Sequence, residues 1–193
     1  FHTTRNLRVV IHGDDFTILG YEDQLDWFRE QIVKTFEIKF RGRLGSGPNH
    51  IKAIRILNRI VSWFEDRIEY EPDQRHAEII IKQMGLLENS RGTSVPGRKW
   101  TKEELTQGNE ELDSTKGSLY RGMVARANYL AQDRSDIRYA VKELSRHMSK
   151  PRNCDWVALK RLGRYLLDKT RSNVSFPYQD KFSSVDVWTD TDH

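Results

Sequence analysis

The stretch from Leu7 to Leu19, which reads LRVVIHGDDFTIL, decides our interpretation of the N-terminal fold. Two short apolar runs, both containing β-branched residues, flank the sequence Gly13-Asp14-Asp15. Glycine permits the backbone dihedrals of a tight turn, and β-branched residues favour strands. The stretch therefore predicts a β-hairpin whose tip carries two adjacent carboxylates.

The pattern that follows the hairpin predicts alternating helices and strands. We expect, in chain order, a helix over 22–36, a strand over 36–40, a glycine-rich loop over 41–50 and strands over 54–64 and 68–70. The next helix should begin near Pro72 and end at Gly85, since proline suits a first helical turn and glycine a helix end. Its apolar face consists of Ala77, Ile80, Ile81 and Met84.

The second half of the chain is predicted to be mostly helical. Residues 86–113 contain Gly, Ser, Pro and a charged patch, which is typical of a linker or surface loop. Helices are expected over 114–132, 135–149 and 155–168, with Asp155 as the N-cap of the third. The inward face of the second consists of Ile137, Ala140, Val141, Leu144 and Met148. Short strand-like runs lie at 174–176 and 185–188.

Composition limits the class of protein. The 193 residues, of which 37% are hydrophobic and 31% charged, suffice for one ordinary domain or two small ones. Five Trp, seven Tyr and eight Phe argue against disorder. Cys154 is the one cysteine and has no partner for an internal disulfide, which favours a reducing, intracellular setting. No apolar run approaches the roughly 20 residues that a membrane span requires.

The positive charge of the chain is concentrated in its second half. The formal net charge is +4, but the stretch from Lys116 to Arg171 holds 14 basic and five acidic residues. This asymmetry favours a polyanion such as nucleic acid as partner. A well-solvated helical surface explains the same pattern, so both interpretations stay open.

The adjacent carboxylates of Asp14 and Asp15 indicate a metal site. They repel each other, and a tight turn by itself needs at most one Asp. Oxygen ligands suit Mg²⁺ or Mn²⁺, and two such ions about 3.5 to 4 Å apart can carry out phosphoryl transfer. The alternative is an exposed polar turn that binds nothing.

Several further motifs carry a resemblance to a known family. The most specific are YRGMVA (120–125), NYLA (128–131), RSDI (134–137), LSRHMSKP (144–151) and RYL (164–166). The hairpin, the run FEIKF (36–40) and the run WTDTD (188–192) extend the pattern. Together they resemble the reverse transcriptase of copia-type retrotransposons over essentially the whole chain.

This resemblance implies an α+β fold, namely a partial reverse-transcriptase palm (hairpin, helix and strands) followed by a mostly helical thumb or connection region. Residues 1–85 would form the C-terminal part of the palm, with the catalytic hairpin and primer-grip-like strands. Residues 86–113 would be a linker or surface loop, and 114–171 the helical thumb or connection region. Residues 172–193 would begin a ribonuclease H-like segment that includes Asp190.

The resemblance also implies the function of an RNA-directed DNA polymerase fragment, located in a cytoplasmic particle or the nucleus. Asp14 and Asp15 would be catalytic and hold Mg²⁺ or Mn²⁺. The expected partners are a template–primer duplex (RNA/DNA or DNA) and deoxynucleoside triphosphates, with no membrane. The residues expected near the primer end or nucleotide are His12, Gly13, Leu57 and Asn58. Those expected to contact nucleic acid are Arg146, Lys150, Lys160, Arg161 and Arg164.

The chain departs from the family pattern in three respects. His12 stands where the family has Tyr, and Asn58 stands where it has Gly. Residues 1–13 contain no Asp or Glu, although the family's site needs a carboxylate from an upstream strand. The chain by itself is therefore expected to be inactive. The alternatives are an inactive relic repurposed to bind nucleic acid, or another palm-type polymerase; the sequence leaves the oligomeric state open.

Overall fold

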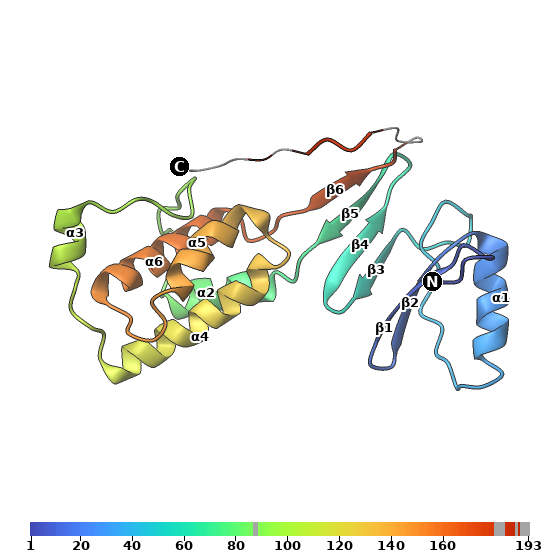
Figure 1. Ribbon diagram of the computed structural model, residues 1–193, viewed down its shortest axis with the longest axis horizontal. Helices are drawn as coiled ribbons and strands as arrows, with labels where there is room; N and C mark the ends of the chain where they lie inside the picture. Colours follow the sequence, from blue (N-terminus) through green and yellow to red (C-terminus); the bar gives the residue numbers. More distant parts are fainter. Residues whose placement is uncertain (87–88, 180–183, 188, 190–193) are drawn as a thin grey trace. The chain divides into compact units, whose positions relative to one another are not determined.

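The computed structural model of the chain describes residues 1–86, 89–179, 184–187 and 189. The chain forms two compact units (Figure 1). The N-terminal unit spans Phe1–Gly42, and the C-terminal unit begins at Arg43. The predicted α+β class is confirmed, with helices and antiparallel sheets in one chain.

The N-terminal unit consists of a hairpin and one helix. Strands β1 (Arg8–His12) and β2 (Asp15–Leu19) pair antiparallel, as predicted. Helix α1 (Glu22–Ile32) follows and ends four residues earlier than expected. Among the described residues of this unit, Leu7 is the one buried apolar side chain. It fits against Gly20, where any side chain would clash with it.

The strand predicted over 36–40 does not form; this prediction was wrong. The alternating apolar residues should have marked a buried face, but Phe36 and Phe40 are both half exposed. Phe40 instead lies under the guanidinium of Arg29, 4.3 Å from its ring centre. A strand needs a neighbour for its backbone hydrogen bonds, and none pairs with this segment in the described part of the chain.

The C-terminal unit contains a four-stranded antiparallel sheet in the order β3-β4-β5-β6. Its strands are β3 (Ala53–Ile56), β4 (Arg59–Trp63), β5 (Arg67–Glu71) and β6 (Val174–Pro177). The single strand predicted over 54–64 is therefore wrong, because a two-residue turn at Leu57-Asn58 divides it. Both turn residues have positive φ, 48° and 66°, as in the turns that match the twist of a hairpin.

The described residues of the C-terminal unit also form five helices. They are α2 (Arg75–Gln83), α3 (Lys102–Gln107), α4 (Ser114–Ala131), α5 (Ser135–Ser145) and α6 (Asn153–Asp168). Helix α2 begins three residues after Pro72 but ends as predicted before Gly85, whose φ is +65°. Helix α3 lies within the predicted linker. It starts with a capping box in which Thr101 and Glu104 bond reciprocally.

The prediction that Asp155 is the N-cap of α6 was wrong. The cap residue is Arg152, and Asp155 is the third helical residue. The Asp155 carboxylate accepts the backbone N–H of Arg152 at 2.8 Å and its side-chain Nε–H at 3.2 Å. Asp155 thus still provides a hydrogen-bond acceptor at the start of α6, but it does so from the third helical position rather than as the N-cap residue.

The hydrophobic core lies between α2, α4, α5 and α6 (Figure 1). The predicted inward residues of α2 and α5 are confirmed. Ala77, Ile80, Ile137 and Val141 are fully buried, whereas Met148 is only partly so. Gly163 allows α6 to approach the segment that follows α2, since a Cβ there would lie 2.9 Å from Leu86. No described residue of the four-stranded sheet belongs to this core.

Contacts join segments on either side of the predicted boundaries at residues 85, 113 and 171, and the predicted domains themselves stay a prediction. The chain divides after Gly42, and helix α2 packs on α4 and α6. Strand β6, from the predicted ribonuclease H-like segment, pairs with β5. Residues 185–187 form no strand, while Trp188 and Asp190 lie outside the described residues.

Candidate functional site

The tip of the β1–β2 hairpin carries the predicted carboxylates. Gly13 (φ +61°) and Asp14 form the turn, and Asp15 is the register partner of His12. All four residues are exposed, and nothing lies within 4 Å of the position of a Cβ on Gly13. The predicted placement of Asp14 and Asp15 at an exposed hairpin tip is confirmed.

The hairpin tip can contribute oxygen ligands to a cation but does not form a complete site. In the part of the chain that the structure describes, no three His, Cys, Asp or Glu residues gather closely enough to hold a metal ion. Mg²⁺ takes one or two carboxylates and completes its shell with water or phosphate oxygens. Asp14 and Asp15 fit that donor set, and their open surroundings leave room for the remaining ligands.

The other residues expected near a primer or nucleotide lie in the C-terminal unit. Leu57 and Asn58 form the β3–β4 turn and are exposed. Asparagine adopts positive φ more readily than most residues. Asn58 therefore preserves the backbone conformation for which glycine is expected at this position.

Arg146 and Lys150, two of the predicted nucleic-acid contacts, border one cleft of about 330 Å³. The cleft is also lined by Asn109, Glu111, His147, Ser149 and Arg152. Each arginine and lysine that lines the cleft forms an ion pair with a carboxylate. Arg146 pairs with Glu143 at 3.2 Å, and Lys150 with Glu111 at 3.7 Å. Arg152 pairs with Asp155 at 3.2 Å. The charge of this cleft is therefore largely balanced.

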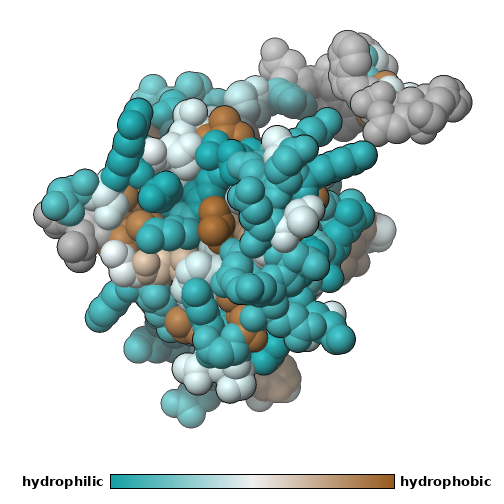
Figure 2. Space-filling model, turned by 90° about the vertical axis from the view of Figure 1, so that its left-hand side faces the viewer, coloured by the Kyte–Doolittle hydropathy of each residue, from teal (hydrophilic) through white to brown (hydrophobic). Residues whose placement is uncertain are grey.

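The other three predicted contacts lie on α6 and differ in accessibility. Lys160 and Arg164 are exposed, one helical turn apart, and have no ion-pair partner among the described residues. Arg161 is half-buried, and its Nε–H is buried without an acceptor in the part of the chain described. Of the five predicted contacts, Lys160 and Arg164 are thus the two that are both exposed and without an ion-pair partner among the described residues. The helical end of the C-terminal unit is largely hydrophilic (Figure 2).

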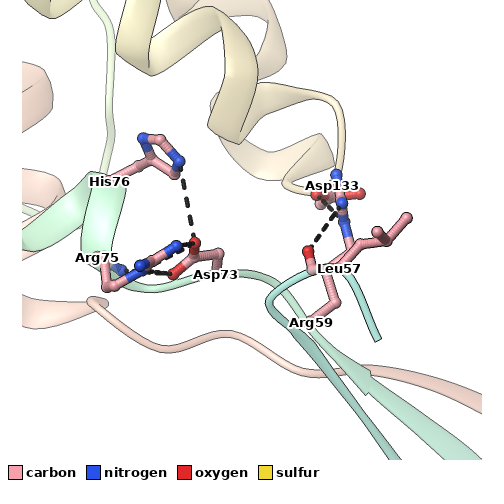
Figure 3. A network of polar contacts seen from close by, with 6 residues as sticks. All are labelled: Leu57, Arg59, Asp73, Arg75, His76 and Asp133. Atoms are coloured by element: carbon pink, nitrogen blue, oxygen red, sulfur yellow. Dashed lines mark hydrogen bonds and ion pairs between the residues drawn. The ribbon is translucent and has the colours of Figure 1, made fainter. Parts of the chain in front are cut away.

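A polar junction that no sequence pattern predicted lies between the sheet and the helices (Figure 3). Arg59 donates from Nε to Asp133 Oδ2 at 2.8 Å, and the Tyr70 hydroxyl donates to Asp133 Oδ1 at 2.7 Å. Nearby, Asp73 accepts three hydrogen bonds from the Arg75 side chain, at 2.9, 3.0 and 2.5 Å, and one from the Arg75 backbone N–H at 3.1 Å. No local signal reveals the first pair, because 74 residues separate Arg59 from Asp133.

His76 and the neighbouring arginines form a second part of this junction. The His76 ring lies against the Tyr129 ring, with ring centres 4.6 Å apart and ring planes tilted by 47°. Burial, together with the charges of Arg126, Arg75 and Arg59, lowers the pKa of His76, although Asp73 acts in the opposite direction. His76 is therefore neutral at physiological pH.

An ion pair with a buried cation lies at the start of α5, where Arg134 is the N-cap residue. The Arg134 side chain is 1% exposed and donates two hydrogen bonds to Asp136, at 2.9 and 2.7 Å. The Tyr165 hydroxyl donates to the same carboxylate at 2.8 Å. Burial raises the pKa of Asp136, but these hydrogen bonds outweigh it and hold the pKa below its ordinary value. The carboxylate is thus ionised and structural.

None of the described helices is both long enough and apolar enough to cross a membrane.

Two curated proteins are similar to parts of this chain. Over 93 residues, 48% of the chain, it is 37% identical to the retrovirus-related Pol polyprotein from transposon RE2 of Arabidopsis thaliana. Over 103 residues, 53% of the chain, it is 36% identical to the retrovirus-related Pol polyprotein from transposon RE1 of the same plant. No family model and no solved structure matches the chain. The matched segments make up only 6% and 7% of these polyproteins, so about half of the chain is similar to a small part of transposon Pol polyproteins.

Proposed function

We propose that the chain is a segment of the reverse transcriptase of a transposon Pol polyprotein. The longer protein then performs metal-dependent DNA synthesis on RNA and DNA templates. The observation that carries this proposal is the exposed hairpin tip with Asp14 and Asp15, in a chain whose relatives are Pol polyproteins.

Asp14 and Asp15 have the role of metal ligands in this proposal. Bound Mg²⁺ or Mn²⁺ would activate the attacking hydroxyl and stabilise the leaving oxygen in nucleotidyl transfer. The hairpin holds the two carboxylates at a fixed point, because β1 and β2 pair along their whole length up to His12 and Asp15. A rigid element positions such ligands better than a loop does.

Metal binding provides the first test. The chain should bind Mn²⁺ weakly. The double substitution Asp14→Asn and Asp15→Asn should weaken binding by at least about tenfold, because it replaces both charged ligands with neutral amides. Titration calorimetry measures the affinity, and Glu30→Gln on the exposed face of α1 is the control. Equal affinity in the double variant and the control would count against the metal role.

Nucleic-acid binding provides the second test. Template–primer duplex should bind the basic helices mainly through phosphate contacts, with little dependence on sequence. Replacing Lys160 and Arg164 by Ala removes two accessible, uncompensated charges. The log–log slope of affinity against salt should become shallower by about 1.8, since each phosphate contact to duplex DNA contributes about 0.9. Fluorescence anisotropy across a salt series measures this slope.

The matched control for that experiment is the double substitution Lys34→Ala and Lys39→Ala. It removes the same net charge from exposed positions of the N-terminal unit. Its slope should stay within experimental error of the parent slope. If both double variants change the slope equally, net charge rather than α6 governs binding, and the proposed contact surface is wrong.

His12 favours one alternative function, a catalytically inactive relic that still binds nucleic acid. The resemblance places Tyr at this position, whereas here His12 is the register partner of Asp15 at the hairpin tip. In the relic, binding through α6 persists without templated synthesis. The activity measurements described in the Discussion separate the two functions.

A further inference from the structure

The β3–β4 turn needs contacts with residues outside the turn if it is to hold one orientation. The sheet contributes no described residue to the hydrophobic core, so packing does not hold the tip of this hairpin. Leu57 and Asn58 both have positive φ, and Leu57 is 38% exposed. A conformation unfavourable for leucine persists only where the surroundings enforce it.

Arg59 provides that support from the first position of β4. Its Nη1 donates to the Leu57 carbonyl at 3.3 Å, which braces the turn from within. Its Nε donates to Asp133 at 2.8 Å, outside the sheet. Its guanidinium also lies 5.6 Å from the ring centre of Tyr129 on α4, within the range of a cation–π contact.

The Asp133 carboxylate accepts hydrogen bonds from residues of two neighbouring strands. While one oxygen of Asp133 accepts from Arg59 of β4, the other accepts from Tyr70 of β5 at 2.7 Å. Tyr70 is the register partner of Val61, so it lies on the same face of the sheet as Arg59. Burial and the hydrogen bond to Asp133 raise the pKa of Tyr70 to about 12. The hydroxyl therefore remains a donor throughout the physiological range.

Asp133 is itself firmly held. It lies in the short connection between α4 and α5, where its N–H donates to the Leu130 carbonyl at 3.1 Å. The next residue, Arg134, is buried and bonds to Asp136 and to the Lys169 carbonyl. The side chains of Arg59 and Asp133 are only 17% and 15% exposed, so water competes little for their contact.

We infer that Asp133 is a positioning residue that fixes the direction of the β3–β4 turn relative to α4 through Arg59. Its consequence for synthesis rests on the proposed function, in which Leu57 and Asn58 lie near the primer end. Loss of the contact would then misplace the primer terminus while leaving the metal ligands intact.

A distance measurement tests the position of the turn independently of any activity. Spin labels are attached at Arg55→Cys on β3 and Ala125→Cys on α4, both exposed positions. Burial raises the pKa of the Cys154 thiol, so this native cysteine competes poorly for the label. The parent should give one narrow distance distribution by pulsed electron paramagnetic resonance. Asp133→Asn should broaden it at least about twofold, because the bond to Arg59 loses its charge assistance.

A second variant that breaks the contact and one control variant accompany the Asp133→Asn measurement. Arg59→Gln breaks the same contact from the sheet side, outside the core, and should broaden the distribution even if Asp133→Asn unfolds the chain. Asp66→Asn removes an exposed ion pair with Arg67 on the same sheet and should leave the distribution narrow. A distribution as narrow in Arg59→Gln as in Asp66→Asn would overturn the inference.

The proposed effect of Asp133 on DNA synthesis is tested in the full polyprotein by primer extension. Asp133→Asn should lower kcat by roughly a hundredfold, the cost expected for a misplacement of about 1 Å, with KM for template–primer changed less than about twofold. A general loss of folding would instead lower the active fraction in an active-site titration. If Asp133→Asn broadens the distance distribution but leaves kcat unchanged, the proposed effect on synthesis is refuted while the structural role of Asp133 stands. Failure of the parent polyprotein to extend primers would refute the proposed function, while the distance measurement would still decide whether Asp133 holds the turn.

Discussion

Replacing Asp14 or Asp15 by Asn in the full polyprotein should reduce templated primer extension by about a thousandfold. The metal ions of such a site stabilise the transition state by several kcal/mol, and each 1.36 kcal/mol corresponds to a factor of ten in rate. The substitution keeps the size of the side chain and leaves the exposed hairpin tip intact, so the loss reflects ligand charge. Glu30→Gln on α1 should extend primers at the parental rate.

The same assay separates the proposed polymerase from its alternatives. The 193-residue chain alone should show no extension, because residues 1–13 contain no Asp or Glu to face the hairpin across the metal pair. Extension by the full polyprotein that survives both Asn substitutions would exclude Asp14 and Asp15 as catalytic. A full polyprotein that is inactive but gains activity with His12→Tyr would favour the relic.

Local sequence patterns were sufficient to predict the hairpin and most helices. The turn at Gly13-Asp14 needs only a residue that accepts positive φ between two β-branched runs, and both signals lie within 13 residues. Helices α4, α5 and α6 were all predicted, and the apolar residues of α5 recur on one face that is buried in the core.

The errors arose where local sequence gives no signal for the observed structure. The run 36–40 alternates like a strand but finds no neighbour to bond with. The run 54–64 appeared continuous because Leu57-Asn58 lacks the usual Asn-Gly signature of a two-residue turn. The Arg59–Asp133 contact, which supports that turn, joins residues 74 positions apart.

The candidate nucleic-acid surface shows the same limit. The predicted nucleic-acid contacts combined Arg146, Lys150 and Arg161 with Lys160 and Arg164. The structure pairs Arg146 and Lys150 with carboxylates and partly buries Arg161. A count of basic residues therefore overstated the uncompensated charge, because it ignores which acid each base faces.

The largest stability effect is expected at the Arg134–Asp136 pair, in which the guanidinium is buried. Asp136→Asn leaves the guanidinium of Arg134 buried at 1% exposure without a countercharge. Breaking a buried pair in this way costs about 3 to 5 kcal/mol, and the 31% exposure of the Asp136 side chain favours the lower figure of about 3. For a chain of this length, the melting temperature should fall by about 6 to 12 °C.

Two comparisons and a pH series decide whether the effect comes from the uncompensated charge. Arg134→Met should cost less than Asp136→Asn, because it leaves a carboxylate that water can reach rather than a buried cation. Asp66→Asn, at an exposed ion pair, should change the stability by less than about 1 kcal/mol. The folded pKa of Asp136 lies below its ordinary value, so its contribution is complete above about pH 5 and is lost as the pH falls through the folded pKa. Thermal melts should therefore show parent and Asp136→Asn converging in acid, and a difference that stays constant down to pH 2 would contradict this origin.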